Sequence, residues 1–204
     1  MISCYMIVQD EEAYIATAIE SVHSYPYIAE VIVVDGGSTD NTKVVATKYP
    51  KVKLYEIPFN PRAGDRFDIQ RNKSIALAKE EWILSLDADE YFEPYVMNAL
   101  PNLLLSSYDA FRFTHKNFVD HIITNIYSCD YHIWLFKNYC RYVGVFHERV
   151  EGYKNCIEVN LAIVHDKTDV QQLLDNQLYW DLGQEPTRGW EKVDGKWTLT
   201  GVNC

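Results

Sequence analysis

Short apolar runs alternate with amphipathic stretches along the first 86 residues of the chain. Four runs have the length of buried strands: 2–8, 30–34, 51–57 and 81–86. Three stretches between them have the spacing or the capping residues of helices: 14–22, 40–48 and 66–79. Alternation of this kind predicts an α/β fold, in which a parallel sheet is covered by helices on both faces.

The second half of the chain is less regular and rich in aromatic residues. Strands are expected at 110–113, 131–136 and 157–164. The sequence around Asp194-Gly195 predicts a hairpin. Tyr, Trp and Phe make up 14% of all residues, and such rings usually form core, although at a cleft they also suit the apolar face of a sugar. The sequence therefore predicts a mixed, aromatic-rich C-terminal half.

Three residues fall where predicted strands end. Val8, Asp35 and Asp87 each lie at or just beyond the carboxyl end of an apolar run. In open α/β sheets, ligands bind at this edge. We therefore expect a binding site built from the residues that follow these strands.

The segment WILSLDADEYF at 82–92 places three carboxylates directly after a buried strand. Asp87, Asp89 and Glu90 repel one another unless a positive charge lies among them. Asp87 and Asp89 fall on one side of an extended chain, within reach of one ion, and oxygen ligands favour Mg²⁺ or Mn²⁺. The alternative is a solvated acidic loop, in which Glu90 and Glu93 begin a helix at its positive end.

Composition narrows the class of protein. A chain of 204 residues, 48% of them apolar, is long enough for one globular domain with a core. The net charge of -10 argues against a nucleic-acid binder. No apolar run approaches ~20 residues, so we expect no transmembrane segment, and the N-terminus lacks the features of a signal peptide. Five cysteines without a CxxC pair indicate a reduced, cytoplasmic protein.

Four motifs taken together resemble the family 2 glycosyltransferases, nucleotide-sugar-dependent enzymes of the GT-A fold. They are MIVQDEE at 6–12, VIVVDGGSTDNT at 31–42, RNKSIALAKEEWILSLDADE at 71–90 and FHE at 146–148. The pattern is most similar to members of the lipopolysaccharide-core type. It also resembles the first domain of multidomain glycosyltransferases from large algal viruses, for which the location would be the host cytoplasm. Gly36 stands where the family usually has a second Asp, so base recognition would rest on Asp35 alone.

The resemblance implies a GT-A type fold, with a mostly parallel, Rossmann-like sheet flanked by helices and a mixed acceptor half. Residues 1–204 would form a single domain. Its parts would be a nucleotide-sugar-binding half at 1–90, an acceptor and catalytic half at 91–170, and an extension at 171–204 that could lead to a further domain. The donor would be a nucleotide diphosphate sugar, by family preference of UDP, bound with Mn²⁺ or Mg²⁺. The acceptor would be a glycan or glycoprotein.

The resemblance also assigns roles in the nucleotide pocket. Asp35 would accept a hydrogen bond from the uracil imide or the ribose. Val8, Gln9 and Glu11 would line the base pocket. Taken without the resemblance, Asp35 is equally well explained as a residue that closes an Asx turn.

Arg71 lies on a predicted helix whose start should face the same edge of the sheet. The resemblance implies that its guanidinium meets a phosphate or the base. The alternative is a surface salt bridge with Asp68 or Glu81.

The metal site follows from the resemblance too. Asp87, with Ala88 beside it, would hold the ribose or the water shell of the cation, and Asp89 would bind the cation directly. A histidine after the last core strand often completes the site in this family, and His165 has that position. The alternative for His165 is a hydrogen-bonded loop residue.

Transfer needs a general base, because a hydroxyl group is a poor nucleophile near neutral pH. Glu148 has the position at which the family carries this carboxylate, and inversion of the anomeric configuration is expected by resemblance. The alternative is a simple ion pair of Glu148 with Arg149 or Arg141. Asp130 and Glu151 are the next candidates for the base.

Other classes of protein fit less well. A sugar nucleotidyltransferase needs a glycine-rich, basic loop after the first strand, and a dinucleotide oxidoreductase needs GxGxxG there. The sequence at that place is Gln9-Asp10-Glu11-Glu12, which provides neither. A catalytically idle domain that binds nucleotide-sugar or glycan is the remaining alternative, and turnover distinguishes it from an enzyme.

Overall fold

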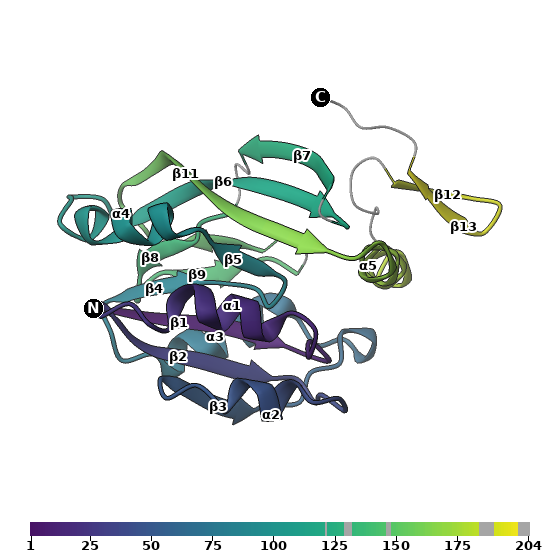
Figure 1. Ribbon diagram of the computed structural model, residues 1–204, viewed down its shortest axis with the longest axis horizontal. Coiled ribbons are helices and arrows are strands. Elements are labelled where there is room, and N and C mark those ends of the chain that lie inside the picture. Colours follow the sequence, from purple (N-terminus) through teal and green to yellow (C-terminus); the bar gives the residue numbers. More distant parts are fainter. Residues whose placement is uncertain (121, 129–131, 146–147, 184–189, 200–204) are drawn as a thin grey trace.

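The computed structural model describes residues 1–120, 122–128, 132–145, 148–183 and 190–199 (Figure 1). Within these residues, one mixed sheet of nine strands forms the centre of the molecule, and two further sheets have two strands each. Among the described helices, none has the length and apolar character needed to cross a membrane.

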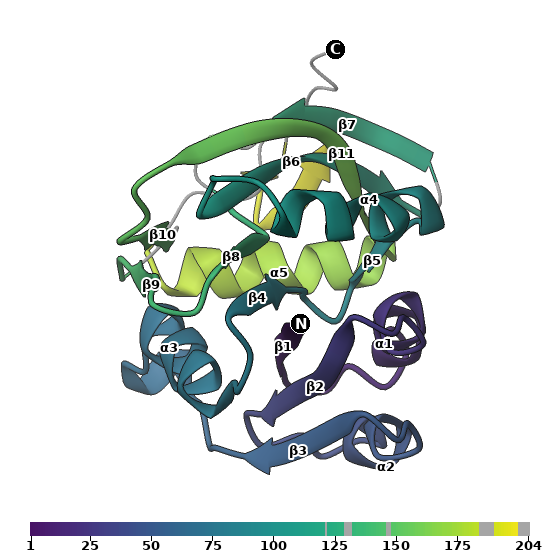
Figure 2. The ribbon, with the colours of Figure 1, turned by 90° about the vertical axis from the view of Figure 1, so that its left-hand side faces the viewer.

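The first half of the large sheet is parallel. Its strands lie in the order β3 (Val52–Glu56), β2 (Ile28–Asp35), β1 (Ile2–Val8) and β4 (Trp82–Ser85), and every pairing among them is parallel. Helices α1 (Ile15–Val22) and α2 (Thr42–Ala46) lie on one face, and α3 (Phe67–Leu77) lies on the other (Figure 2). The predicted parallel sheet with helices on both faces is confirmed, and each boundary lies within two residues of the expected one. Helix α2 is the most shortened element, by two residues at each end.

The second half of the sheet is mixed, as expected. Next to β4 come β8 (Leu135–Lys137), β6 (Ala110–Val119), β11 (Cys156–Lys167) and β5 (Glu90–Phe92), with β7 (Ile122–Ser128) paired to β6. The pairing of β11 with β6 is parallel, and the other pairings of this half are antiparallel. The strand predicted at 131–136 is shorter in the structure, and residue 131 lies outside the described residues.

Several elements were not predicted. They are helix α4 (Pro94–Leu104), helix α5 (Asp169–Asp181), the short β5 and β7, and the small sheet of β9 (Arg141–Val143) with β10 (Arg149–Glu151). The hairpin predicted around Asp194-Gly195 is present as β12 (Trp190–Val193) and β13 (Lys196–Leu199). Figure 1 shows α5 directly after β11, at the end of the molecule towards which the arrows of β1 and β2 point.

The parallel strands are buried on both faces. Along β1, Cys4 and Met6 join the cluster that contains Ile19 of α1, whereas Tyr5 joins the cluster that contains Ile75 of α3. Successive side chains of a strand point to opposite faces, so one apolar strand fills two layers. Burying a side chain such as Met6, Ile19 or Ile75 contributes about 1.5–3 kcal/mol. This core holds the strand ends, and hence the functional edge, in fixed positions.

A buried carboxylate at the amino edge of the sheet holds the end of α3. Glu30 Oε1 accepts hydrogen bonds from Ser3 Oγ at 2.7 Å and from the backbone N–H of Lys79 at 2.8 Å. Its Oε2 pairs with Lys53 Nζ at 2.5 Å. Because these partners come from β1, β3 and the segment after α3, Glu30 ties the helix to three strands.

Replacing Glu30 by Gln should lower the free energy of unfolding near neutral pH by about 1–3 kcal/mol, the usual effect of losing hydrogen bonds to a charged group. Burial alone would raise the pKa of Glu30, but hydrogen bonds from Lys53, Ser3 and the Lys79 N–H hold this pKa below its usual range. A lowered pKa contributes stability above the unfolded-state value and loses it as the pH falls through the folded-state value. Urea unfolding should therefore show the two proteins converging below about pH 4.3.

Glu20→Gln provides the matched control, because Glu20 accepts a hydrogen bond from Tyr49 at an exposed site. This variant should unfold almost like the wild type at each pH. Parallel pH curves for wild type and Glu30→Gln would contradict the role given to Glu30.

Candidate active site

The strand ends converge as predicted. Val8 at the end of β1 lies opposite Asp35 at the end of β2, and the N–H of Gly36 donates to the carbonyl of Val8 at 2.8 Å. Asp87 follows β4, the neighbour of β1 on its other side. These residues therefore share one edge of the sheet.

Asp35 closes the turn that was considered as its alternative role, and its contact with the base or ribose stays a prediction. Its Oδ2 accepts from the backbone N–H groups of Gly37 at 2.9 Å and Ser38 at 3.0 Å, so it closes the turn. Its Oδ1 is buried and has no hydrogen-bond partner among the described residues. A buried acceptor without a partner is unfavourable in the free protein. It is also ready to accept a hydrogen bond from a ligand.

Gly36, at the first position of the turn after Asp35, lies close to its neighbours. A Cβ added there would lie 3.2 Å from Phe59 Cβ and 3.4 Å from Gln9 Oε1. A side chain at this position would therefore require Phe59 to shift by a few tenths of an ångström. The same closeness places the exposed Gln9 next to the turn.

The loop after β1 is bound to the loop after β2. Asp10, with φ of 57°, accepts from the N–H of Thr39 at 2.7 Å, and its own N–H donates to Ser38 Oγ at 2.9 Å. The N–H of Glu11 donates to Thr42 Oγ1 at 2.7 Å. Sequence reasoning missed this structural role of Asp10, although Asp is one of the few residues that tolerate a positive φ.

Glu11 lies within the electrostatic reach of the acidic motif. Burial, followed by the negative charge of Asp89, raises the pKa of the Glu11 carboxyl to about 8. Its Oε2 is buried without a hydrogen-bond partner among the described residues. Its assigned place in the base pocket stays a prediction.

Arg71 joins the two halves of the chain. Its Nη1 and Nη2 donate to Asp87 at 2.8 Å and 3.0 Å, and its Nε donates to Glu148 at 2.7 Å. Only 7% of the Arg71 side chain is exposed. The surface salt bridge considered as the alternative is not formed, because Asp68 pairs with Arg66 and Glu81 pairs with Lys137. The expected contact of Arg71 with a phosphate or the base stays a prediction.

The hydrogen bonds of Arg71 bring Glu148, which lies just before β10, to the edge of the sheet that carries Asp87. The ion-pair partners considered for it are occupied otherwise: Arg149 pairs with Glu151, and Arg141 donates to the carbonyls of Asn138 and Cys140. Glu151 is exposed in that outward pair. Asp130 lies outside the described residues.

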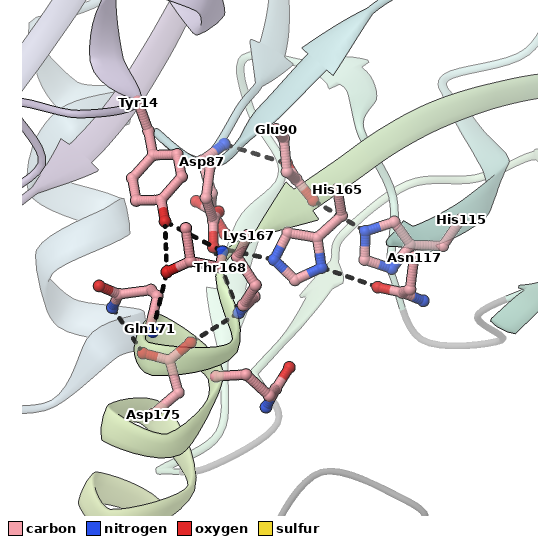
Figure 3. A network of polar contacts seen from close by, with 12 residues as sticks. Tyr14, Asp87, Glu90, His115, Asn117, His165, Lys167, Thr168, Gln171 and Asp175 are labelled. Atoms are coloured by element: carbon pink, nitrogen blue, oxygen red, sulfur yellow. Dashed lines mark hydrogen bonds and ion pairs between the residues drawn. The ribbon is translucent and has the colours of Figure 1, made fainter. Parts of the chain in front are cut away.

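His165 meets Asp89 because of the pairing between β5 and β11. In this antiparallel pair, His165 lies opposite Glu90, the residue after Asp89. His165 Nε2 is 2.8 Å from Asp89 Oδ2. Its Nδ1 is 2.7 Å from Asn117 Oδ1, and Figure 3 shows this second contact. His165 therefore lies in a strand, and the alternative that it is a loop residue is wrong. Ala88, which lies between Asp87 and Asp89 in the sequence, is buried.

A lysine that sequence reasoning missed shares the same carboxylate. Lys167 Nζ lies 3.3 Å from Asp89 Oδ2 and 2.6 Å from Asp175 Oδ2 on α5. Burial alone would raise the pKa of Asp89, but the charges of His165 and Lys167 hold it well below its usual range. Because His165 and Lys167 are two residues apart on one strand, a strand assignment that continued past Val164 would have placed both on one face.

Glu90 has a structural role in this motif. Its Oε2 accepts from the N–H of Asp87 at 3.0 Å and from Trp134 Nε1 at 3.4 Å, while its Oε1 lies 3.2 Å from His115 Nε2. Burial would raise the pKa of Glu90, but His115 lowers it to about 2. The Glu90 carboxylate thus fixes the backbone at Asp87. Residue Glu90 begins strand β5, whereas the acidic-loop alternative expected it to begin a helix.

The donor set suits a divalent cation in part. Asp87 uses both oxygens on Arg71, whereas Asp89 and His165 provide one carboxylate and one imidazole at the same point. Among the described residues, no group of three or more His, Cys, Asp or Glu is arranged to hold a metal ion. Two protein ligands fit a cation that takes its other ligands from water and phosphate, as Mg²⁺ commonly does.

Comparisons with known proteins give a family model and several relatives that are similar to this chain. The family model described as "Glycosyl transferase family 2" matches residues 3–155. The lipopolysaccharide core biosynthesis glycosyltransferase LpsC of Rhizobium meliloti is 32% identical over 111 residues, which are 52% of this chain and 38% of that protein. The SPbeta prophage-derived glycosyltransferase SunS of Bacillus subtilis is 25% identical over 171 residues, which are 81% of this chain and 39% of that protein. The chain thus spans less than half the length of these relatives.

One solved structure is similar over almost the whole chain. It is glucosyl-3-phosphoglycerate synthase from Mycobacterium tuberculosis, in complex with Mn²⁺, UDP and glucosyl-3-phosphoglycerate. The TM-score is 0.61 at 15% identity, and the match covers 98% of this chain and 86% of that chain. At this identity the likeness concerns the fold, and it confirms the predicted GT-A type architecture.

Replacing Arg71 by Met should lower the free energy of unfolding by about 3–5 kcal/mol, because it leaves two carboxylates without their buried cation. Urea unfolding measures this change. A second substitution, Glu148→Gln, removes one of these charges and should recover part of the loss. Arg149→Met is the control, since it breaks an exposed pair of little energetic value. Equal stability of Arg71→Met and Arg149→Met would contradict the bridging role.

Proposed function

This chain belongs to glycosyltransferase family 2, and we propose that it transfers a sugar from a nucleoside diphosphate donor to a hydroxyl group of a glycan or glycoprotein acceptor. The observation that carries the proposal is the Arg71 bridge, which joins Glu148 to Asp87 at the edge where Asp35 presents a free acceptor. A nucleotide pocket and a carboxylate for proton transfer are the two parts that such a reaction requires.

The donor is most simply a UDP-sugar. Uracil presents an imide N–H, which needs an acceptor, and Asp35 Oδ1 is a buried acceptor without a partner among the described residues. Val8 and Gln9 flank this position, and Asp87 with Ala88 would border the ribose. The fold is shared with a synthase whose complex contains UDP and Mn²⁺, which supports the same choice of donor.

Asp89 and His165 would hold Mn²⁺ or Mg²⁺, with Asp87 acting on the water shell of the ion. When bound, such a cation offsets the charge that develops on the departing diphosphate. Both side chains are already oriented, since Asn117 fixes the imidazole and Lys167 contacts the carboxylate. Orientation of a ligand by a second contact is common at metal sites.

Glu148 would serve as the general base. Its carboxylate takes the proton from the acceptor hydroxyl as the hydroxyl oxygen bonds to the anomeric carbon, and the diphosphate leaves with the electron pair of the broken C–O bond. Arg71 holds Oε1 of Glu148 and thereby orients the group. A single displacement of this kind inverts the anomeric configuration.

The acceptor and the location belong to the same proposal. LpsC acts in lipopolysaccharide core biosynthesis by its name, which favours a glycan acceptor for this chain. Cys4, Cys140 and Cys156 are free thiols, which fits a reducing, cytoplasmic location.

Replacing Asp35 by Asn should weaken UDP binding by about 10-fold or more, which is the effect of losing a hydrogen bond to a charged group. Asn keeps an oxygen for the Gly37 and Ser38 amides but turns the free acceptor into a donor. Isothermal titration calorimetry and thermal unfolding measure the two effects separately. Asp35→Ala should lower both affinity and melting temperature, because the turn loses its acceptor. Unchanged UDP affinity in Asp35→Asn would exclude the base contact.

Replacing Glu148 by Gln should reduce sugar transfer by about 10²–10⁴-fold, because the proton acceptor is lost. UDP affinity should change little. A panel of nucleotide-sugars, assayed with Mn²⁺ and with EDTA, provides the measurement.

Glu151→Gln is the matched control, since Glu151 is exposed and paired outwards with Arg149. Full activity in Glu148→Gln together with loss in Glu151→Gln would move the base to Glu151. Donor binding without turnover of any donor in the wild type would support the idle domain instead.

A further inference from the structure

A buried ammonium group occupies the position between the acidic motif and helix α5. Only 9% of the Lys167 side chain is exposed, and its Nζ contacts Asp89 at 3.3 Å and Asp175 at 2.6 Å. Figure 3 shows Lys167 between His165 of the same strand and Asp175 of the helix. The donor site as derived above uses this cation only to orient Asp89.

The local structure presents Lys167 to the site. It is the last residue of β11, and Thr168 then caps α5 by accepting from the N–H of Gln171. Gln171 Nε2 in turn donates to Asp175 Oδ1 at 3.0 Å. The carboxylate that holds Lys167 is therefore itself held, and both partners of the lysine are fixed.

A diphosphate adds negative charge to an edge that is already acidic. Within the described part of the chain, Arg71 and Lys167 are the Lys or Arg side chains that pair with Asp87, Asp89 or Glu148. Arg71 donates through Nε, Nη1 and Nη2 to Glu148 and Asp87. Lys167 instead has one contact to the motif and one to a helix outside it. An ammonium group has three donors and binds any anionic oxygen, so a phosphate can replace a carboxylate on it.

We propose that Lys167 is a tethered cation of the diphosphate site, which exchanges Asp175 for diphosphate oxygens when the donor binds and shares Asp89 with a divalent cation. This inference rests on the proposed function, because it concerns the same donor. Two consequences follow. Nucleoside diphosphate binding persists in part without metal, and Lys167 opposes metal binding when no nucleotide is present.

The first experiment measures UDP affinity by calorimetry in EDTA for wild type and Lys167→Met. The variant should bind UDP about 10-fold more weakly, the effect of losing a charged hydrogen bond. Uridine, which has no phosphate, should bind both proteins equally. Lys137→Met is the control, because Lys137 pairs with Glu81 at the opposite edge of the sheet and should bind UDP like the wild type. Equal UDP affinity of wild type and Lys167→Met overturns the inference.

A second variant keeps the test decisive if Lys167→Met folds poorly. Asp175→Asn removes the carboxylate that competes for Lys167, so UDP should bind more tightly than to the wild type in EDTA. A gain of UDP affinity cannot be explained by partial unfolding of the variant. Unchanged or weaker UDP binding in Asp175→Asn contradicts the exchange.

Mn²⁺ binding without nucleotide, measured by electron paramagnetic resonance, tests the shared carboxylate. Lys167→Met should bind Mn²⁺ more tightly, since Asp89 loses its competing cation. Unchanged Mn²⁺ affinity means that Asp89 is not shared. A different result would contradict the proposed function itself: the wild type would bind no nucleoside diphosphate, either with or without Mn²⁺. If the wild type binds UDP only with Mn²⁺ and Lys167→Met binds it equally well, the function stands and the inference is wrong.

Discussion

The buried contact of Arg71 with Asp87 and Glu148 is the interaction on which the candidate site depends. A guanidinium that is almost fully buried is unfavourable unless it is paired and hydrogen-bonded. Its partners come from different parts of the chain, since Asp87 follows β4 and Glu148 precedes β10. The requirement to neutralise one cation therefore brings a catalytic candidate of the second half to the ligand edge of the first. An exposed ion pair, worth little, would not impose this arrangement.

The acidic motif is stable because its carboxylates have different partners. Asp87 is bound by Arg71, and Asp89 by a histidine and a lysine of β11. Glu90 is bound by His115 of β6 and by Trp134. A cation that binds Asp89 therefore competes with His165 and Lys167 for its carboxylate. The positive charge expected among these residues is supplied, in the protein itself, by side chains that are distant in the sequence.

Periodicity in the sequence is sufficient to predict the parallel half of the sheet, because strand and helix patterns are local. It also predicts the ligand edge, because the carboxyl ends of parallel strands lie at the same edge of a sheet. The partners of Arg71 could not be found in this way. Sequence proximity suggested Asp68 and Glu81, whereas Glu148 lies 77 positions away. Helix α5 was missed although Thr168 and Gln171 form a recognisable capping pair, because the segment has few periodic apolar residues.

Helix α5 is held differently from the sheet. Its first turn is bound through Thr168 and the hydroxyl of Tyr14, and its end through Asp181 and Arg62. These contacts are exposed, and exposed polar contacts contribute little to stability. The ion pair of Lys167 with Asp175 is less exposed than that of Arg62 with Asp181, since 9% of the Lys167 and 25% of the Asp175 side chain are exposed. Because Lys167 also contacts Asp89, whatever binds Lys167 acts on a contact that α5 shares with the acidic motif.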